Sequence, residues 1–255
     1  MSFSPEPVSP KPRDYGRTNI LDKGIGLAML DDLLTVAAPF VDMSKIGWGT
    51  ALVLRDLGRR IDCYRSHDVT VCCGGTLFEY AYVTGQLDEY RGWLHEHGLT
   101  HVEVSNGTID IASDQKLSLI ELFAEEFTVL SEVGSKDAEA IVSPARWVRA
   151  IQQELSAGAW SVILEGRESG SAGMYRKSGE MRTGLIDEVL EAGIDPRRLV
   201  FEAPLKAHQV YLISLIGADV NLANISPEEA VALETLRRGL RSDTLEMVHG
   251  ALGGN

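Results

Sequence analysis

Eight apolar runs, most of them rich in β-branched residues, alternate with amphipathic stretches along this chain of 255 residues. Strands that alternate with helices pair in parallel, because each helical crossover returns the chain to the same edge of the sheet. Eight such units predict an α/β protein, a single-domain (β/α)₈ TIM barrel over residues 17–245. The eight runs are TNILD (18–22), FVDMSKIG (40–47), DVTVCCGG (68–75), HVEVSNG (101–107), FTVLSEVG (127–134), SVILEGR (161–167), LVFEAP (199–204) and DVNLANI (219–225).

The stretches between the runs carry apolar residues at helical spacing. Residues 26–38 and 144–157 are two such segments, and a third, 227–238, follows Ser226, which we expect to be its N-cap. An open doubly wound sheet is the alternative, but no G-x-G-x-x-G follows the first run, which disfavours a dinucleotide-binding fold. Residues 1–16 read as an irregular leader and residues 246–255 as a flexible tail.

The composition narrows the class of protein. A net charge of −13 disfavours binding to nucleic acid or to an anionic membrane, because phosphate attraction requires a basic surface. Three cysteines make no disulfide framework, and the chain has neither a signal-like N-terminus nor an apolar run long enough to span a bilayer. We therefore expect a cytoplasmic enzyme with small-molecule substrates, and we expect it to form a homo-oligomer.

Glutamates recur where the predicted strands end. Barrel enzymes place their catalytic groups at these ends, and a Glu between apolar neighbours in such a strand points into the barrel or its mouth. Carboxylates that converge there repel one another unless a cation joins them, and hard oxygen ligands suit Mg²⁺. The alternative is that each Glu pairs with a Lys or Arg of the same layer. The candidate metal ligands are Glu103, Glu132, Glu165 and Glu202.

Cations and glycine-rich turns also lie near these ends. Lys23, Lys45, Arg167 and Lys206 follow strands or lie within them. Arg167 and Ser169 belong to a Gly/Ser loop whose backbone amides, with one guanidinium, could cradle a phosphate, although a solvated loop fits the pattern equally well. A second turn, residues 74–76, leads into a helix N-terminus, which favours anions.

Seven longer segments of the chain carry a recognisable pattern: KPRDYGRTNILDKG (11–24), VDMSKIGWGT (41–50), GGTLFEYA (74–81), EVSNGTIDI (103–111), SEVGSKD (131–137), LEGRESGSAGMYRKSGEMR (164–182) and FEAPLKAHQVYLI (201–213). Together these segments resemble the phosphosulfolactate synthase family. The resemblance implies a (β/α)₈ barrel lyase that adds sulfite to C3 of phosphoenolpyruvate with Mg²⁺, giving (2R)-phospho-3-sulfolactate. In archaea this reaction opens coenzyme M biosynthesis.

The resemblance also assigns roles to individual residues. Sulfite attack at C3 would place negative charge on the substrate as an enediolate, which a general acid then protonates at C2. The SEVG-x-KD match makes Lys136 the expected acid, with Lys45 as the next candidate. The alternative for Lys136 is that it is a surface lysine paired with Asp137. Lys45, Arg167 and Lys206 would neutralise phosphate, carboxylate and sulfite, with Lys23 and Ser169 as further substrate-binding candidates, and Glu132 and Glu165 rank first as metal ligands.

Other functions remain compatible with the same sequence. One is a related barrel enzyme that acts on another enolpyruvate or on a phosphorylated acid. Another is a non-catalytic stress-tolerance homologue that kept the fold without the chemistry, although the intact Lys136, Glu132, Glu165 and Arg167 argue against it. The sequence also leaves open the reverse reaction in sulfonate breakdown.

Overall fold

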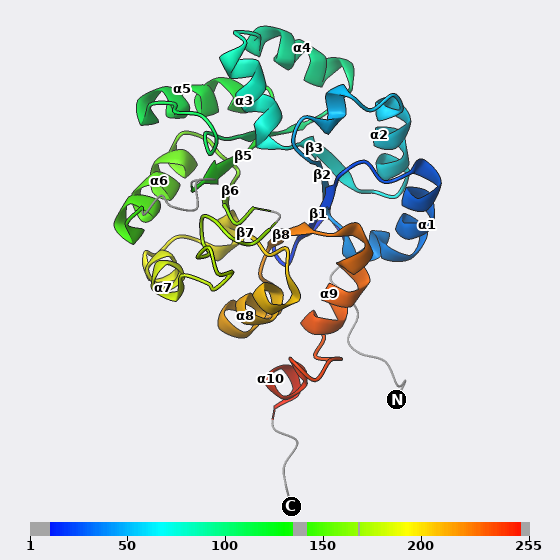
Figure 1. Ribbon diagram of the computed structural model, residues 1–255, viewed down its shortest axis with the longest axis vertical. Helices are drawn as coiled ribbons and strands as arrows, with labels where there is room; N and C mark the ends of the chain where they lie inside the picture. The colour runs from blue at the N-terminus through cyan, green and yellow to red at the C-terminus, as the bar shows by residue number, and fades with distance from the viewer. Residues whose placement is uncertain (1–10, 135–141, 168, 251–255) are drawn as a thin grey trace, which may run out of the picture.

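Eight parallel strands curl into one nearly closed barrel (Figure 1). The computed structural model describes residues 11–134, 142–167 and 169–250. The order of the strands is β3-β2-β1-β8-β7-β6-β5-β4, and β3 lies beside β4 although no backbone ladder between them is present in these described residues. The predicted single-domain (β/α)₈ barrel is confirmed. The strands are β1 (Thr18–Asp22), β2 (Met43–Ile46), β3 (Thr70–Cys73), β4 (His101–Val104), β5 (Thr128–Val133), β6 (Ser161–Leu164), β7 (Leu199–Glu202) and β8 (Leu222–Ile225).

The α-helices form a ring around the barrel, except for α10, which lies outside the ring beyond α8 and α9 (Figure 1). Both α3 and α4 lie between β3 and β4 in the sequence. The helices are α1 (Leu27–Ala37), α2 (Leu57–Ser66), α3 (Gly75–Val83), α4 (Leu87–Glu96), α5 (Ser113–Ala124), α6 (Pro144–Ser156), α7 (Thr183–Glu191), α8 (Lys206–Ile216), α9 (Ala230–Arg237) and α10 (Leu245–His249). Short 3₁₀ turns are η1 (Ala38–Phe40), η2 (Thr50–Leu52), η3 (Pro196–Arg198) and η4 (Pro227–Glu229).

The predicted helical segments correspond to α1, α6 and α9, with one local difference. The third segment begins as the 3₁₀ turn η4 and becomes α-helical only at Ala230. Ser226 precedes this turn, but its side chain makes no capping bond to the backbone. Its hydroxyl donates to Glu228 Oε2 at 2.5 Å.

The side chains inside the barrel form layers, because every second side chain of a strand points to the same face. Six apolar side chains from β2, β3, β5, β6, β7 and β8 form a buried cluster inside the barrel, and two residues further along several of these strands the inward-facing side chain is charged. Side chains two apart share one face of a strand, so the charged layer lies above the apolar one, toward the C-terminal ends. The cluster is Met43, Cys72, Leu130, Ile163, Val200 and Ala223.

The two ends of the described chain pack differently. Residues 11–16 have no helix or strand, yet Arg13 Nε donates to Asp42 Oδ1 at 2.9 Å and anchors this segment beside the start of β2. At the other end, Leu245–His249 form α10 where the sequence predicts the start of a flexible tail. None of the helices in these residues has the length and apolarity that crossing a membrane would require.

Asp22 fixes the end of β1 through a fully buried network. Its Oδ2 accepts hydrogen bonds from Arg60 at 2.7 Å and from the Tyr64 hydroxyl at 2.9 Å, both on α2. Its Oδ1 accepts from the backbone amide of Gly24 at 2.7 Å. Burying a carboxylate is tolerable only with such partners, so this network ties the first strand to the helix after the second.

We predict that Arg60→Met lowers the free energy of unfolding by about 3–5 kcal/mol, because it leaves the Asp22 carboxylate buried without its cation. Urea denaturation followed by circular dichroism measures the change. Arg59→Met is the matched control, since Arg59 is the exposed neighbour on the same helix and should change stability by no more than about 0.5 kcal/mol. Equal stability of the two variants would contradict the structural role of this ion pair.

Candidate active site

A cavity of about 340 Å³ opens at the C-terminal ends of the strands. Barrel enzymes carry their chemistry at this face. Four carboxylates and two cations line the cavity, and all six residues belong to strands or to the segments that follow them. The lining consists of Leu21, Lys45, Trp48, Gly74, Gly75, Thr76, Glu103, Thr108, Glu132, Glu165, Arg167, Glu202 and Asn224.

Lys45 lies between carboxylates from opposite sides of the barrel. Its ammonium donates to Glu202 Oε1 at 2.9 Å and to Glu103 Oε1 at 3.3 Å. Burial disfavours the charge, but Glu103, Glu202 and Glu132 outweigh that cost and raise the pKa of Lys45 well above its ordinary value. Lys45 is therefore held as a cation, which makes it an electrostatic anchor in this structure.

Glu103, Glu132 and Glu202 form a compact cluster of oxygen ligands. One carboxylate oxygen of each lies within 4.8 Å of the others, and all three side chains are buried. Burial raises the pKa of Glu103 well above its usual range, Lys45 opposes that rise, and the charge of Glu132 adds to it. A divalent cation would relieve the repulsion, so these three residues can hold a metal such as Mg²⁺.

Ser105 connects this cluster to a further glutamate. Its hydroxyl lies 2.9 Å from Glu132 Oε1 and 3.1 Å from Glu79 Oε1, and Glu79 also accepts from the Thr108 amide at 2.9 Å. Gly75 packs directly behind Ser105, because a Cβ at Gly75 would lie 2.4 Å from the Ser105 Cβ. The start of α3 thus approaches the cluster closely at a position where only glycine fits.

The loop after β6 supports the glutamates with its backbone. The amide of Gly166 donates to Glu202 Oε2 at 2.8 Å, and the amide of Arg167 donates to Glu165 Oε1 at 2.7 Å. The sequence suggested that the amides of this loop cradle a phosphate. These two are already committed to carboxylates, because the loop turns back over the mouth with Arg167 at a φ of 56°. The exposed guanidinium of Arg167 remains on the cavity wall.

The other predicted substrate-binding residues lie at or beyond the rim. Lys23 is exposed, and its Nζ lies 5.8 Å from the ring centroid of Trp48, which lines the cavity.

Lys206, at the start of α8, pairs with Asp243 Oδ2 at 2.7 Å and does not line the cavity. The hydroxyl of Ser169 contacts that of Ser171 at 2.7 Å, also away from the lining. Lys136 lies outside the described residues.

Apart from Leu21 and the turn at residues 74–76, three lining residues were not among the predicted site residues. Trp48 and Asn224 have φ angles of 52° and 58°, a left-handed conformation that turns each side chain at a strand end. Thr108 comes from the loop after β4. Asn224 could have been found as a polar residue at the end of the last run, whereas nothing in the sequence marks Trp48 or Thr108.

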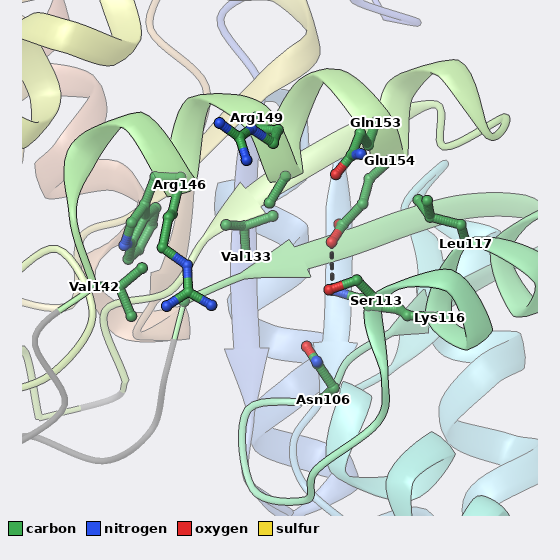
Figure 2. Close-up of a pocket in the computed structure, with 13 residues that line it drawn as sticks. Asn106, Ser113, Lys116, Leu117, Val133, Val142, Arg146, Arg149, Gln153 and Glu154 are labelled. Carbon is green, nitrogen blue, oxygen red and sulfur yellow. Dashed lines mark hydrogen bonds and ion pairs between the residues drawn. The ribbon is translucent and has the colours of Figure 1, made fainter.

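A second cavity, of about 450 Å³, lies outside the barrel between α5 and α6 (Figure 2). The end of β5 lies between this cavity and the mouth, since Glu132 lines the mouth and Val133 lines the outer cavity. Lys116 is almost fully buried and donates to Glu154 Oε1 at 2.7 Å and to the backbone carbonyl of Glu132 at 2.6 Å. Glu132 therefore presents its carboxylate to the mouth and its carbonyl to α5. We place the candidate active site at the mouth, despite its smaller volume, because the converging carboxylates lie there.

Comparison with known proteins shows to which family this chain belongs. The family model of (2R)-phospho-3-sulfolactate synthase (ComA) matches residues 6–243. This chain belongs to that family. A phosphosulfolactate synthase from Methanothermobacter thermautotrophicus is 45% identical over 253 residues, with 97% of this chain and 98% of the relative covered. One from Bacillus subtilis strain 168 is 43% identical over 236 residues, covering 92% and 94%. The family predicted from the sequence is confirmed, as is the prediction that its members are enzymes.

Solved structures support the fold alone. A 3-hexulose-6-phosphate synthase from Salmonella typhimurium aligns with a TM-score of 0.57 at 15% identity, covering 91% of this chain and 100% of that one. The YdjI aldolase of Escherichia coli K12 aligns with a TM-score of 0.55 at 13% identity, covering 92% and 90%. Both are at identities where the barrel is shared and the chemistry of the phosphosulfolactate synthase family is not implied.

We predict that Lys45→Met destabilises the protein by about 3–5 kcal/mol at neutral pH in the presence of a chelator, because Glu103 and Glu202 lose their buried cation. The same loss removes the cation that opposes the raised pKa of Glu103, so the folded-state pKa of that carboxyl rises further above its unfolded value. The stability deficit should therefore be smallest in mild acid, below the unfolded pKa, and should grow as the pH rises from there toward the raised pKa. Urea denaturation at several pH values measures it. Lys23→Met, which removes an exposed cation, is the control, and equal, pH-independent losses in both variants would contradict the anchor role.

Proposed function

We propose that this protein joins sulfite to C3 of phosphoenolpyruvate with the help of Mg²⁺ and forms (2R)-phospho-3-sulfolactate. Membership of the phosphosulfolactate synthase family supports the class of reaction. The observation that carries the proposal is the composition of the mouth, where four glutamates and two cations of the described chain line one cavity. An anionic substrate can enter such a site only if a metal and local cations offset the carboxylates.

The glutamate cluster fits a magnesium ion. Among the described lining residues, the four carboxylates outnumber Lys45 and Arg167 by two charges, which a divalent cation would balance. One oxygen of Glu103, Oε2, is buried and has no hydrogen-bond partner in the described part of the chain. Glu103, Glu132 and Glu202 would hold the ion, with Glu165 beside them. When bound, Mg²⁺ supplies positive charge to the carboxylate oxygens of the substrate.

The substrate's phosphate requires donors that are not committed to carboxylates. Arg167 offers a guanidinium, which can grip two phosphate oxygens at once. The first turn of α3, at Gly75, faces the same cavity, and the leading amides of a helix lack intrahelical acceptors. We propose that the phosphate or the incoming sulfite lies between these two features. Lys23 at the rim would attract both anions.

The bond changes balance without a further reactant. The lone pair on sulfur forms the C3–S bond, and the electrons of the C2–C3 double bond move toward C2, where the adjacent carboxylate delocalises them as an enediolate. A proton delivered to C2 completes the product. We propose Lys136 as the donor, since Lys45 is held as a cation by Glu103 and Glu202 and is poorly suited to give up a proton.

Incubation with phosphoenolpyruvate, sulfite and Mg²⁺ tests the proposed function. We expect a product whose mass is that of phosphoenolpyruvate plus sulfurous acid, and no product after exhaustive chelation, with activity restored by added Mg²⁺ or Mn²⁺. Absence of a sulfonated product under all metal conditions would refute the proposed reaction. Full activity after chelation would instead refute only the role of the metal.

Lys136 variants test the proton donor. We predict that Lys136→Ala lowers kcat by about 10²–10⁴-fold, the usual effect of losing a general acid, with little change in the affinity for phosphoenolpyruvate. Lys136→Arg should not restore the rate, because a guanidinium scarcely releases its proton. Lys177→Ala, on the loop after β6, is a control for charge alone. Near-normal turnover of Lys136→Arg would reduce Lys136 to an electrostatic contact.

A further inference from the structure

The larger cavity lies on the outer side of β5, so it is separate from the mouth of the barrel. Val133 and Gly134 form its inner wall, α5 contributes Ser113, Lys116 and Leu117, and the remaining wall is mostly α6. Figure 2 shows Glu154 extending from α6 toward Ser113 and Lys116 on α5, Arg146 extending from α6 on the other side of Val133, and Asn106 on the loop opposite α6. Its volume of about 450 Å³ falls within the usual range of small-molecule sites.

The charge of this cavity is opposite to that of the whole chain. Among the described residues that line it, Lys116, Arg146 and Arg149 are basic and Glu154 is the one acid, in a protein whose net charge is −13. Lys116 is occupied by Glu154. Arg146 and Arg149 make no hydrogen bond or ion pair in the part of the chain that the structure describes, so both guanidinium groups are available to an anion.

Buried polar atoms on the same wall point to the kind of ligand. Trp147 is 1% exposed, and its indole N–H has no partner among the described residues. Glu154 is 5% exposed, and its Oε2 likewise has no partner among them. Unpaired buried polar atoms are costly, and a bound molecule that accepts from the indole and donates to Glu154 would remove both penalties.

We infer that this cavity is a second ligand site, which binds a small organic anion bearing an acid group and at least one hydroxyl. The acid group, a phosphate or a carboxylate, is held by Arg146 and Arg149, and the hydroxyl donates to Glu154 Oε2. The class is that of small hydroxy acids and polyol phosphates. The site does not depend on the reaction proposed for the mouth, since none of the residues that the structure describes lines both cavities.

Calorimetric titration with glycerol 3-phosphate at constant ionic strength tests this site. The titration uses Arg167→Gln, in which the proposed phosphate contact at the mouth is removed, so that binding at the outer cavity is measured. We expect saturable binding with one site per chain. Adding Arg146→Gln and Arg149→Gln should weaken the binding by about tenfold to a hundredfold, the effect of losing a charge-assisted hydrogen bond. Inorganic phosphate, which lacks the polyol hydroxyls, should bind more weakly than glycerol 3-phosphate.

A matched control separates the site from general electrostatics. Arg55→Gln with Arg59→Gln removes the same charge from two exposed arginines that line neither cavity and should leave the affinity unchanged. The inference is overturned if the Arg167→Gln protein binds no glycerol 3-phosphate, or if the two double variants lose affinity equally. Equal affinity for inorganic phosphate and glycerol 3-phosphate would overturn the assignment of Glu154 as the acceptor of a hydroxyl.

Discussion

The repulsion between carboxylates at the top of the barrel is the constraint on which the rest of the site depends. Glu103, Glu132 and Glu202 are buried within a few ångströms of one another, where water screens their charges poorly. Lys45 offsets part of this charge, and the amide of Gly166 and the hydroxyl of Ser105 offset more. These partners come from β2, from the loop after β6 and from the end of β4, so the electrostatic cost is distributed over much of the barrel.

The strand β5 separates two environments of opposite charge. On its inner side Glu132 belongs to the acidic mouth, and on its outer side Lys116, Arg146 and Arg149 line the basic cavity. Lys116 bridges the two sides, because its ammonium donates both to Glu154 and to the carbonyl of Glu132. A buried ion pair of this kind adds little net stability, yet it fixes the position of the strand end. The position of Glu132 therefore depends on helices that take no part in the mouth.

The sequence predicts the barrel well because its signal is local. Several strand runs carry the two-residue period that places Leu130 one layer below Glu132 and Val200 one layer below Glu202, and the order of the elements then predicts parallel pairing. The same reasoning predicts that the glutamates lie at one face of the barrel, where the strands end. Lys116 and Glu154 could not be found this way, because each lies on a helix and their contact spans 38 residues of sequence. The pairing of Lys206 with Asp243 depends in the same way on distant tertiary packing.

The loop after β6 shows that a sequence motif can predict where a functional loop lies more reliably than what the loop binds. The sequence suggested that the backbone amides of this Gly/Ser loop could cradle a phosphate, with a solvated loop as the alternative, and the structure shows two of its glycines in close packing. A Cβ at Gly166 would lie 2.5 Å from the ring of Tyr175, and one at Gly173 would lie 2.0 Å from the carbonyl oxygen of Glu165. The Tyr175 hydroxyl in turn donates to the Glu202 carbonyl at 2.6 Å. The glycines let the loop lie directly on the two glutamate-bearing strand ends. Because the amides of Gly166 and Arg167 donate to these carboxylates, the proposal for an anionic substrate relies instead on the Arg167 guanidinium and on the start of α3 across the mouth.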